Sequence, residues 1–249
     1  MTTPIWPWPT LFAHRGGGAL APENTLPGMA MAAGHRFAAV EFDVKLSRDG
    51  VCVVMHDDTL ERTTDGSGPV AERSYAELAR LDAGGWFGPA FAGAVVPTLD
   101  AVASYCLQHD LLVNAEIKPC PGREVETGER VAQELGRLWQ GRAVPPLLSS
   151  FSWEALEAAR ATAPDLPRGW LVEDWPDDWQ DRLDALGAVS LHCDEQLLTP
   201  ARVGAVHHAG YRLLAYTVND AARARALLAW GVDGLFTDAL ATLPAALRG

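Results

Sequence analysis

Short apolar runs alternate with longer amphipathic runs along nearly the whole chain of 249 residues. Apolar runs of about four to eight residues favour strands, and runs with apolar positions three or four apart favour helices. The pattern predicts strands at 11–14, 39–46, 51–56, 111–117, 146–151, 168–172, 189–193, 213–218 and 235–237. It predicts helices at 25–35, 99–109, 123–141, 153–163, 179–185, 200–209 and 221–230, with a closing helix after the last strand. The first of these helices is expected to have Asn24 or Thr25 as its N-cap. We therefore expect a parallel sheet covered by helices.

The alternation is interrupted once, between residues 57 and 97, where Gly, Pro and Thr are frequent. A turn signal at 47–50 separates the two preceding strands, so 51–56 is expected to be a hairpin partner of 39–46. Assigning 51–56 to this excursion leaves eight strands. We predict an α/β fold: one (β/α)₈ TIM barrel across 1–249, with a small insertion at about 57–97 after the second barrel strand. Two small domains are the weaker alternative, and no GxGxxG motif follows the first strand to favour a dinucleotide site.

Composition and charge exclude several classes of function. A hydrophobic content of 48% is incompatible with disorder, and the net charge of −12 argues against nucleic acid or an anionic membrane as partner. The chain has no signal-peptide pattern and no long apolar run, so we expect a cytoplasmic protein without stable membrane anchoring. Its four scattered cysteines are expected to be buried thiols in a reducing compartment. The Trp/Pro-rich start, with Trp6 and Trp8, is expected to pack against the barrel bottom. No motif indicates an oligomeric state.

Four polar clusters lie at the ends of predicted strands, where parallel α/β folds build their active sites. The clusters are His14-Arg15-Gly16, Glu41-Phe42-Asp43, His56-Asp57 and Glu116-Ile117-Lys118. They supply enough acid for a hard cation, two imidazoles for proton transfer, and two cations for an anion. This inventory suits metal-assisted phosphoryl chemistry.

Glu41 and Asp43 lie two residues apart on one strand, so both side chains point to the same face. Two such carboxylates repel each other unless a cation lies between them. With Glu116 from a neighbouring strand, they predict an all-oxygen site for one divalent cation, Mg²⁺ or Ca²⁺. The alternative is that one acid pairs with Arg15 or Lys118 while the other is solvated.

His14 and His56 end separate strands. Either histidine alone is as well explained by a structural role, but together they offer a proton acceptor and a proton donor for phosphodiester hydrolysis. Arg15 offers a planar fork for two phosphate oxygens, and Lys118 offers a point charge on the face that Glu116 occupies. The other interpretation of Lys118 is that it neutralises Glu116.

Taken together, these residues resemble the glycerophosphodiester phosphodiesterase family, and the resemblance covers essentially the whole chain. Each motif alone is weak, and their number and order carry the match. Beyond the four clusters, the motifs are 22–25 (PENT), 49–50 (DG), 58–60 (DTL) with 62–64 (RTT) and Gly66, 97–99 (PTL), 114–115 (NA), 217–219 (TVN) and 234–238 (GLFTD).

The resemblance implies metal ligands at Glu41, Asp43 and Glu116, catalytic histidines at His14 and His56, and phosphate contacts from Arg15 and Lys118. It also implies hydrolysis of small glycerophosphodiesters, such as glycerophosphocholine, to glycerol 3-phosphate and an alcohol. By analogy, the metal activates the glycerol 2-hydroxyl, which forms a cyclic phosphate that water then opens. Which histidine is the acid in the first step stays open.

The chain departs from the family pattern at two positions. Ser47 replaces a frequent Thr, which keeps the hydroxyl, and Tyr216 replaces a frequent Trp, which changes a wall of the pocket. We expect Tyr216 to contact substrate. Other aromatic side chains are expected mostly in the core, with some on an apolar side of the pocket: Trp86, Phe87, Phe151 and Trp170.

Two alternatives to a soluble glycerophosphodiesterase remain. One keeps the chemistry and changes the substrate to a lysophospholipid, which needs an exposed apolar entrance. The other is a barrel that binds a phosphorylated ligand without catalysis, which predicts loss of a histidine or carboxylate that this chain retains. Structural hydrogen bonding is the default role for the remaining polar residues of interest: His192, Asp194, His207, His208 and Asp238.

Overall fold

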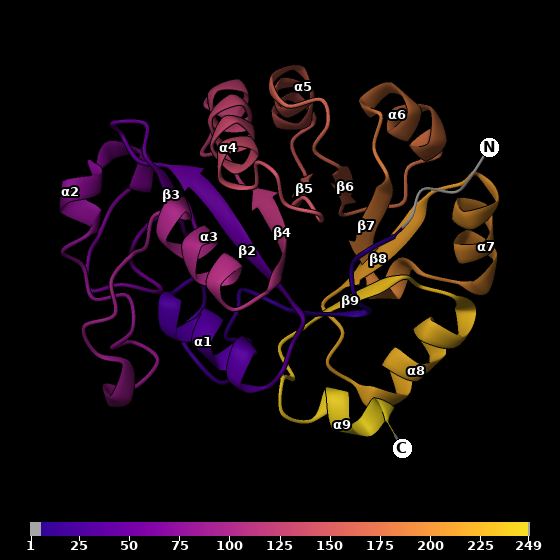
Figure 1. Ribbon diagram of the computed structural model, residues 1–249, viewed down its shortest axis with the longest axis horizontal. Coiled ribbons are helices and arrows are strands. Elements are labelled where there is room, and N and C mark those ends of the chain that lie inside the picture. Colours follow the sequence, from indigo (N-terminus) through magenta and orange to yellow (C-terminus); the bar gives the residue numbers. More distant parts are fainter. Residues whose placement is uncertain (1–5, 249) are drawn as a thin grey trace.

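The computed structural model describes residues 6–248, which form a closed barrel of parallel strands wrapped by helices (Figure 1). Neighbours around the barrel follow the order β1-β9-β8-β7-β6-β5-β4-β2, and pairing of β1 with β2 closes it. The eight strands are β1 (Leu11–Ala13), β2 (Ala39–Leu46), β4 (Leu112–Ile117), β5 (Leu147–Ser150), β6 (Arg168–Val172), β7 (Ser190–Asp194), β8 (Arg212–Tyr216) and β9 (Gly234–Thr237). The predicted (β/α)₈ barrel is confirmed.

Helices follow the barrel strands and bury their apolar faces against the outside of the sheet (Figure 1). Most begin at a Ser, Thr or Asp whose side chain accepts a backbone N–H, as N-caps do. At the first helix the cap is Thr25, not Asn24. The helices are α1 (Leu26–Gly34), α3 (Leu99–Gln108), α4 (Glu124–Leu138), α5 (Trp153–Thr162), α6 (Trp179–Leu186), α7 (Pro200–His208), α8 (Ala221–Trp230) and α9 (Leu243–Leu247).

The strand β3 (Cys52–Val54) lies outside the barrel and runs antiparallel to β2, with Val54 opposite Val44. The turn before it is closed by the Ser47 hydroxyl, which donates to Asp49, and by Gly50 at φ 76°, a conformation glycine tolerates best. The excursion predicted for 51–56 is confirmed. Because β3 returns toward the barrel, it delivers His56 beside the carboxyl-terminal part of β2.

Residues 57–97 contain only short elements, η1 (Val70–Glu72), α2 (Tyr75–Leu78) and η2 (Pro89–Phe91). They lie at one side of the barrel, next to α1 and α3 (Figure 1). An apolar cluster of their own anchors them to β3: Val53, Met55, Leu60, Val70, Leu78, Ala83, Val96 and Cys120. We propose that this segment is an insertion within a single barrel domain, since its core is continuous with β3.

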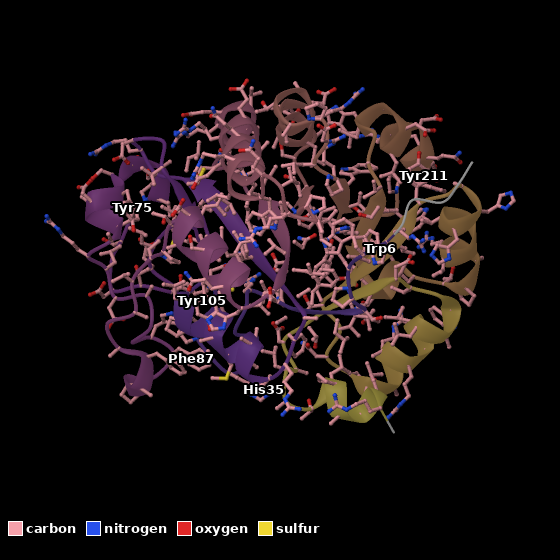
Figure 2. All side chains as sticks on the ribbon, in the orientation of Figure 1. Trp6, His35, Tyr75, Phe87, Tyr105 and Tyr211 are labelled. Atoms are coloured by element: carbon pink, nitrogen blue, oxygen red, sulfur yellow. The ribbon has the colours of Figure 1, made fainter. Side chains whose placement is uncertain are left out.

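Trp8 closes the amino end of the barrel. It is buried among residues near the starts of the strands, including Phe12, Leu147 and Leu214. Trp6 packs on it with ring centroids 4.7 Å apart. Trp6 and Tyr211, both labelled in Figure 2, line one cavity at the bottom of the barrel. The expected packing at the barrel bottom is thus confirmed for Trp6 and Trp8, while residues 1–5 lie outside the described part.

All four cysteines are free and buried, as predicted from their scattered positions. Between residues 6 and 248, the structure contains no helix whose length and apolarity would allow it to cross a bilayer.

The close packing of α4 on α5 gives a test of the fold. A Cβ at Gly128 would lie 2.2 Å from the backbone oxygen of Ala155, whereas at Gly136 on the same helix its nearest neighbour is 4.0 Å away. We expect Gly128→Ala to lower the free energy of unfolding by about 1–3 kcal/mol through overpacking. Gly136→Ala should raise it by about 0.5–1 kcal/mol, because alanine is the better helix former.

Urea unfolding of the two variants and the parent measures both changes. Equal effects of the two substitutions would contradict the close approach of α4 to α5.

Candidate active site

Three carboxylates meet at the carboxyl-terminal mouth of the barrel. Glu41 and Asp43 point inward from β2, and Glu116 on β4 is the register partner of Asp43. One oxygen from each lies within 4.8 Å of the others. No more than 9% of the surface of any of these three residues is exposed. The alternative interpretation, in which one of the two acids on β2 is solvated, is therefore wrong.

Burial and mutual repulsion set the protonation of the three acids. Burial first, and the charge of Asp43 second, raise the pKa of Glu41 to about 8 and that of Glu116 to about 7. Burial would also raise the pKa of Asp43, but Lys118 and Arg15 outweigh it and lower that pKa. Asp43 is therefore firmly charged, whereas burial and the charge of Asp43 oppose ionisation of Glu41 and Glu116.

These donors fit a hard divalent cation. Ligand oxygens around one ion, with metal–oxygen bonds of about 2.0–2.6 Å, lie no more than about 4–5 Å apart, close to the spread of this cluster. A cation there would relieve the repulsion that raises the pKa of Glu41 and Glu116. The donor set is all oxygen, which suits Mg²⁺ or Ca²⁺.

Groups from the loop after β1 orient two of the acids. The backbone N–H of Arg15 donates to Glu41 Oε2 at 2.9 Å. The Asn24 amide donates to Asp43 Oδ2 at 2.7 Å, and its oxygen accepts the Asp43 N–H at 3.1 Å. Arg15 and Asn24 both have positive φ, at 52° and 57°, so this loop turns sharply to reach β2.

His14 and His56 lie at the same mouth, and a carboxylate holds the Nδ1 atom of each ring. His14 Nδ1 lies 2.7 Å from Asp238, and His56 Nδ1 lies 2.6 Å from Asp57. Nδ1–H donation to a carboxylate leaves Nε2 as the atom available for proton transfer. His14 Nε2 lies 4.0 Å from Glu41 Oε2, next to the acidic cluster.

The two histidines differ in their surroundings. Burial opposes a charge on His14, but the Asp238 hydrogen bond and the Glu41 charge outweigh it and raise the pKa of His14. Burial, helped by Arg15 and Lys118, lowers the pKa of His56 against the attraction of Asp43. The pair can thus hold one proton to give and one vacant nitrogen to accept.

Lys118 and Arg15 bring positive charge to the acidic cluster. Lys118 Nζ donates to Glu116 at 2.8 Å and lies 3.6 Å from Asp43. Arg15 Nη1 donates to Glu23 at 2.8 Å, and its Nε lies 3.7 Å from Asp43. Both cations face the mouth, and Lys118 also neutralises Glu116 as the other interpretation had it.

A cavity of about 150 Å³ lies beside the cluster and opens into a larger cleft of about 760 Å³. Tyr216 and Phe151 form part of its wall, edge to face at 5.8 Å. The Tyr216 hydroxyl donates to the Val172 carbonyl, so the ring, more than the hydroxyl, faces the cavity.

The other aromatic candidates lie elsewhere: Trp86 and Phe87 pack together in 57–97, and Trp170 is in the outer core. Every site residue predicted from the sequence, except Asp43, lines the small cavity.

Sequence reasoning assigned no role to several residues that hold the site. Asn24 was considered only as a helix cap, and Asp57 only as part of a cluster. Asp238 was expected to make structural hydrogen bonds, yet its partner is His14. Pairing of β9 with β1, which a closed barrel requires, is the signal that could have placed Asp238 beside His14. Glu23 and Arg62 carry no such signal.

Comparison with known proteins agrees with this geometry. Residues 14–242 match the profile of the Glycerophosphoryl diester phosphodiesterase family. The chain is 34% identical to a glycerophosphodiester phosphodiesterase of Caldanaerobacter subterraneus, covering 94% of this chain and 95% of that protein. It is 31% identical to one of Bacillus subtilis, covering 91% and 82%.

The structure is also similar to that of a phosphodiesterase of Oleispira antarctica, which was solved with the product sn-glycerol-3-phosphate. The TM-score is 0.92, the identity 37%, and the match covers 97% of this chain and 98% of that one.

The raised pKa values of Glu41 and Glu116 predict how the metal-free protein responds to pH. Between the ordinary value of 4.5 and about 8, the folded state keeps protons that the unfolded state has lost. Stability should therefore fall as pH rises through this window, by more than about 1.4 kcal/mol, the equivalent of one pKa unit. Glu41→Gln should make the decline shallower, and millimolar Mg²⁺ or Ca²⁺ should do the same for the parent.

Urea unfolding of EDTA-treated protein from pH 5 to 9 measures the decline. Glu157→Gln, on the exposed face of α5, is the matched control and should leave it unchanged. If the stability of Glu41→Gln fell with pH as steeply as that of the parent, the raised pKa of Glu41 would be contradicted.

Proposed function

The chain belongs to the glycerophosphoryl diester phosphodiesterase family, and we propose that it hydrolyses small glycerophosphodiesters at the mouth of its barrel. It is a phosphodiester hydrolase. The products we propose are glycerol 3-phosphate and an alcohol, from substrates such as glycerophosphocholine or glycerophosphoethanolamine.

One observation carries the proposal: three clustered carboxylates lie at the same mouth as two imidazoles, each with Nδ1 held by a further carboxylate. Glu41, Asp43 and Glu116 are the groups that would hold Mg²⁺ or Ca²⁺. When bound there, the cation supplies Lewis-acid stabilisation of charge on phosphoryl oxygens.

Arg15 and Lys118 bind the phosphate in this proposal. Both carry positive charge into the cavity, and the planar guanidinium of Arg15 can donate to two phosphate oxygens together. Their attraction for the anion positions the phosphorus atom between the two histidines and stabilises charge that develops on it.

His14 and His56 move the protons. One Nε2 accepts the proton of the glycerol 2-hydroxyl as that oxygen attacks phosphorus, and the other Nε2–H protonates the departing alcohol oxygen. In the second step the roles reverse, water opens the cyclic phosphate, and the starting protonation states return. Asp238 and Asp57 orient the two rings throughout.

The shape of the site favours small substrates over lysophospholipids. The cavity of about 150 Å³ suits a glycerol moiety, and an acyl chain on that moiety would have to extend into the cleft outside. The cleft outside is rich in acids, including Glu124, Glu154 and Glu173, which an acyl chain would have to desolvate. A non-catalytic barrel is disfavoured because no member of the reactive set is missing.

The partner of the protein is therefore a small molecule in this proposal. A cytoplasmic location, expected from the sequence, stays a prediction.

Catalysis at this site predicts large losses from single substitutions. His14→Ala and Glu41→Ala should each lower the release of glycerol 3-phosphate from glycerophosphocholine by at least about 10²-fold, the lower range for losing a proton-transfer group. EDTA should abolish the activity of the parent, and Mg²⁺ or Ca²⁺ should restore it.

His208→Ala, on the exposed end of α7, serves as the control and should keep full activity. Undiminished turnover by metal-free parent protein would reject the metal-dependent mechanism.

The cavity and the acidic cleft beside it predict substrate choice. A 1-acyl lysophosphatidylcholine should be hydrolysed with kcat/KM at least about tenfold below that of glycerophosphocholine, because its acyl chain would have to desolvate the acids of the cleft. Choline release from both compounds, measured below the micelle concentration of the lipid, gives the ratio. A preference for the lysophospholipid would replace the first substrate class by the second.

A further inference from the structure

Arg62 lies in the segment that follows β3, outside the barrel, yet its side chain connects two parts of the site. Its Nη1 and Nη2 donate to the two carboxylate oxygens of Glu23 at 2.7 and 2.8 Å. Its Nε and Nη2 donate to the two oxygens of Asp57 at 2.6 and 2.9 Å. One guanidinium thus holds two carboxylates in paired, planar contacts, the strongest geometry for such bonds.

Each carboxylate makes a second contact, and both contacts reach proposed active-site residues. Glu23 Oε1 also accepts from Arg15 Nη1 at 2.8 Å. Asp57 Oδ1 also bonds His56 Nδ1 at 2.6 Å. An unbroken chain of charged hydrogen bonds therefore runs from Arg15 through Glu23, Arg62 and Asp57 to His56.

The charges along this chain are stable around neutral pH. Hydrogen bonds to Glu23 and Asp57 raise the pKa of Arg62. The bonds from Arg62 lower the pKa of Asp57, and with Arg15 they lower that of Glu23 against the effect of burial. Neither carboxylate takes up a proton near pH 7, so both keep accepting from their partners.

We propose that Arg62 is a positioning residue that sets the phosphate-binding Arg15 and the proton-transferring His56 relative to each other. This inference rests on the function proposed above. Through Glu23 it limits the orientations of the Arg15 guanidinium, and through Asp57 it fixes the ring and the tautomer of His56.

The location of Arg62 separates this role from a purely structural one. Its side chain is 45% exposed while those of Glu23 and Asp57 are 14% and 26% exposed, so water reaches these ion pairs, screens them and limits their net contribution to stability. A catalytic geometry is more sensitive, since a misplacement of about 1 Å can cost about 10²-fold in rate. Removing Arg62 should therefore disturb catalysis far more than folding.

The two halves of this hydrogen-bond chain, the Arg15 arm through Glu23 and the His56 arm through Asp57, predict different kinetic effects. Glu23→Gln weakens the hold on Arg15 and should raise KM about tenfold with a smaller change in kcat. Asp57→Asn weakens the hold on His56 and should lower kcat about tenfold with a smaller change in KM. Arg62→Gln should do both, and Arg62→Lys, which keeps the charge and loses the fork, should recover only part of the loss.

The matched control is Arg48→Gln in an exposed ion pair with Glu77, also outside the barrel and remote from the cavity lining. Its kcat and KM on glycerophosphocholine should equal those of the parent, and thermal unfolding of all variants should stay close to the parent. Arg62→Gln that behaves like Arg48→Gln in both constants would overturn the proposal. So would additive losses when Arg62→Gln is combined with Glu23→Gln, because the two then act independently.

Calorimetric titration with inorganic phosphate tests the Arg15 arm without turnover. Arg62→Gln and Glu23→Gln should weaken phosphate binding, while Asp57→Asn and Arg48→Gln should not. A parent that releases no glycerol 3-phosphate but shows this binding pattern would refute the proposed function and support the positioning role. Unchanged phosphate binding in Arg62→Gln would refute the Arg15 arm even in an active enzyme.

Discussion

Repulsion among three buried carboxylates is the constraint on which the rest of the site depends. Glu41 and Asp43 face the same way because a strand repeats every two residues, and strand pairing brings Glu116 level with Asp43. Burial makes this arrangement costly unless positive charge or hydrogen-bond donors compensate it. The loop after β1 provides such donors, and Lys118, the residue directly after β4, provides positive charge. A divalent cation would balance the remaining negative charge of the three carboxylates. The same electrostatic arrangement therefore determines both the stability of the barrel mouth and its proposed chemistry.

The barrel and the main reactive residues could be predicted from the sequence because they follow local periodicity. Predicted strands that contain Glu41 and Glu116, or that end at His14, bring those side chains together in one parallel sheet. His56 also ended a predicted strand, but it reaches the mouth by a different route. Its strand β3 runs antiparallel and outside the barrel, so only the hairpin returns it to Asp43. The hairpin itself was predictable from the turn at 47–50, and His56 was named as a site residue from its polar cluster with Asp57.

Residues that hold the reactive groups were harder to predict, since their partners are remote in the chain. Asn24 bonds Asp43 only because the preceding loop bends through positive φ, and a capping role explained the same residue equally well. Glu23 and Arg62 are 39 positions apart, and no strand register relates them. Tyr216 lines the cavity, while its contact with substrate stays a prediction. Its hydroxyl donates to a backbone carbonyl, a contact that depends on the relation of β8 to β6. The pattern of apolar and polar residues specifies which face or end of an element a side chain occupies. The contacts of these supporting residues depend instead on loop conformations, which that pattern does not specify.

The hydrogen bond between His14 and Asp238 has a consequence for the nascent chain during synthesis. The two partners are 224 positions apart, directly after β1 and directly after β9, and β1 can pair with β9 only once both strands have left the ribosome. A nascent polypeptide can thus assemble most of its sheet while the imidazole still lacks its orienting carboxylate. In the mechanism proposed above, His14 therefore gains its oriented ring only after residue 238 has emerged, and a product truncated before that residue would lack the orienting group.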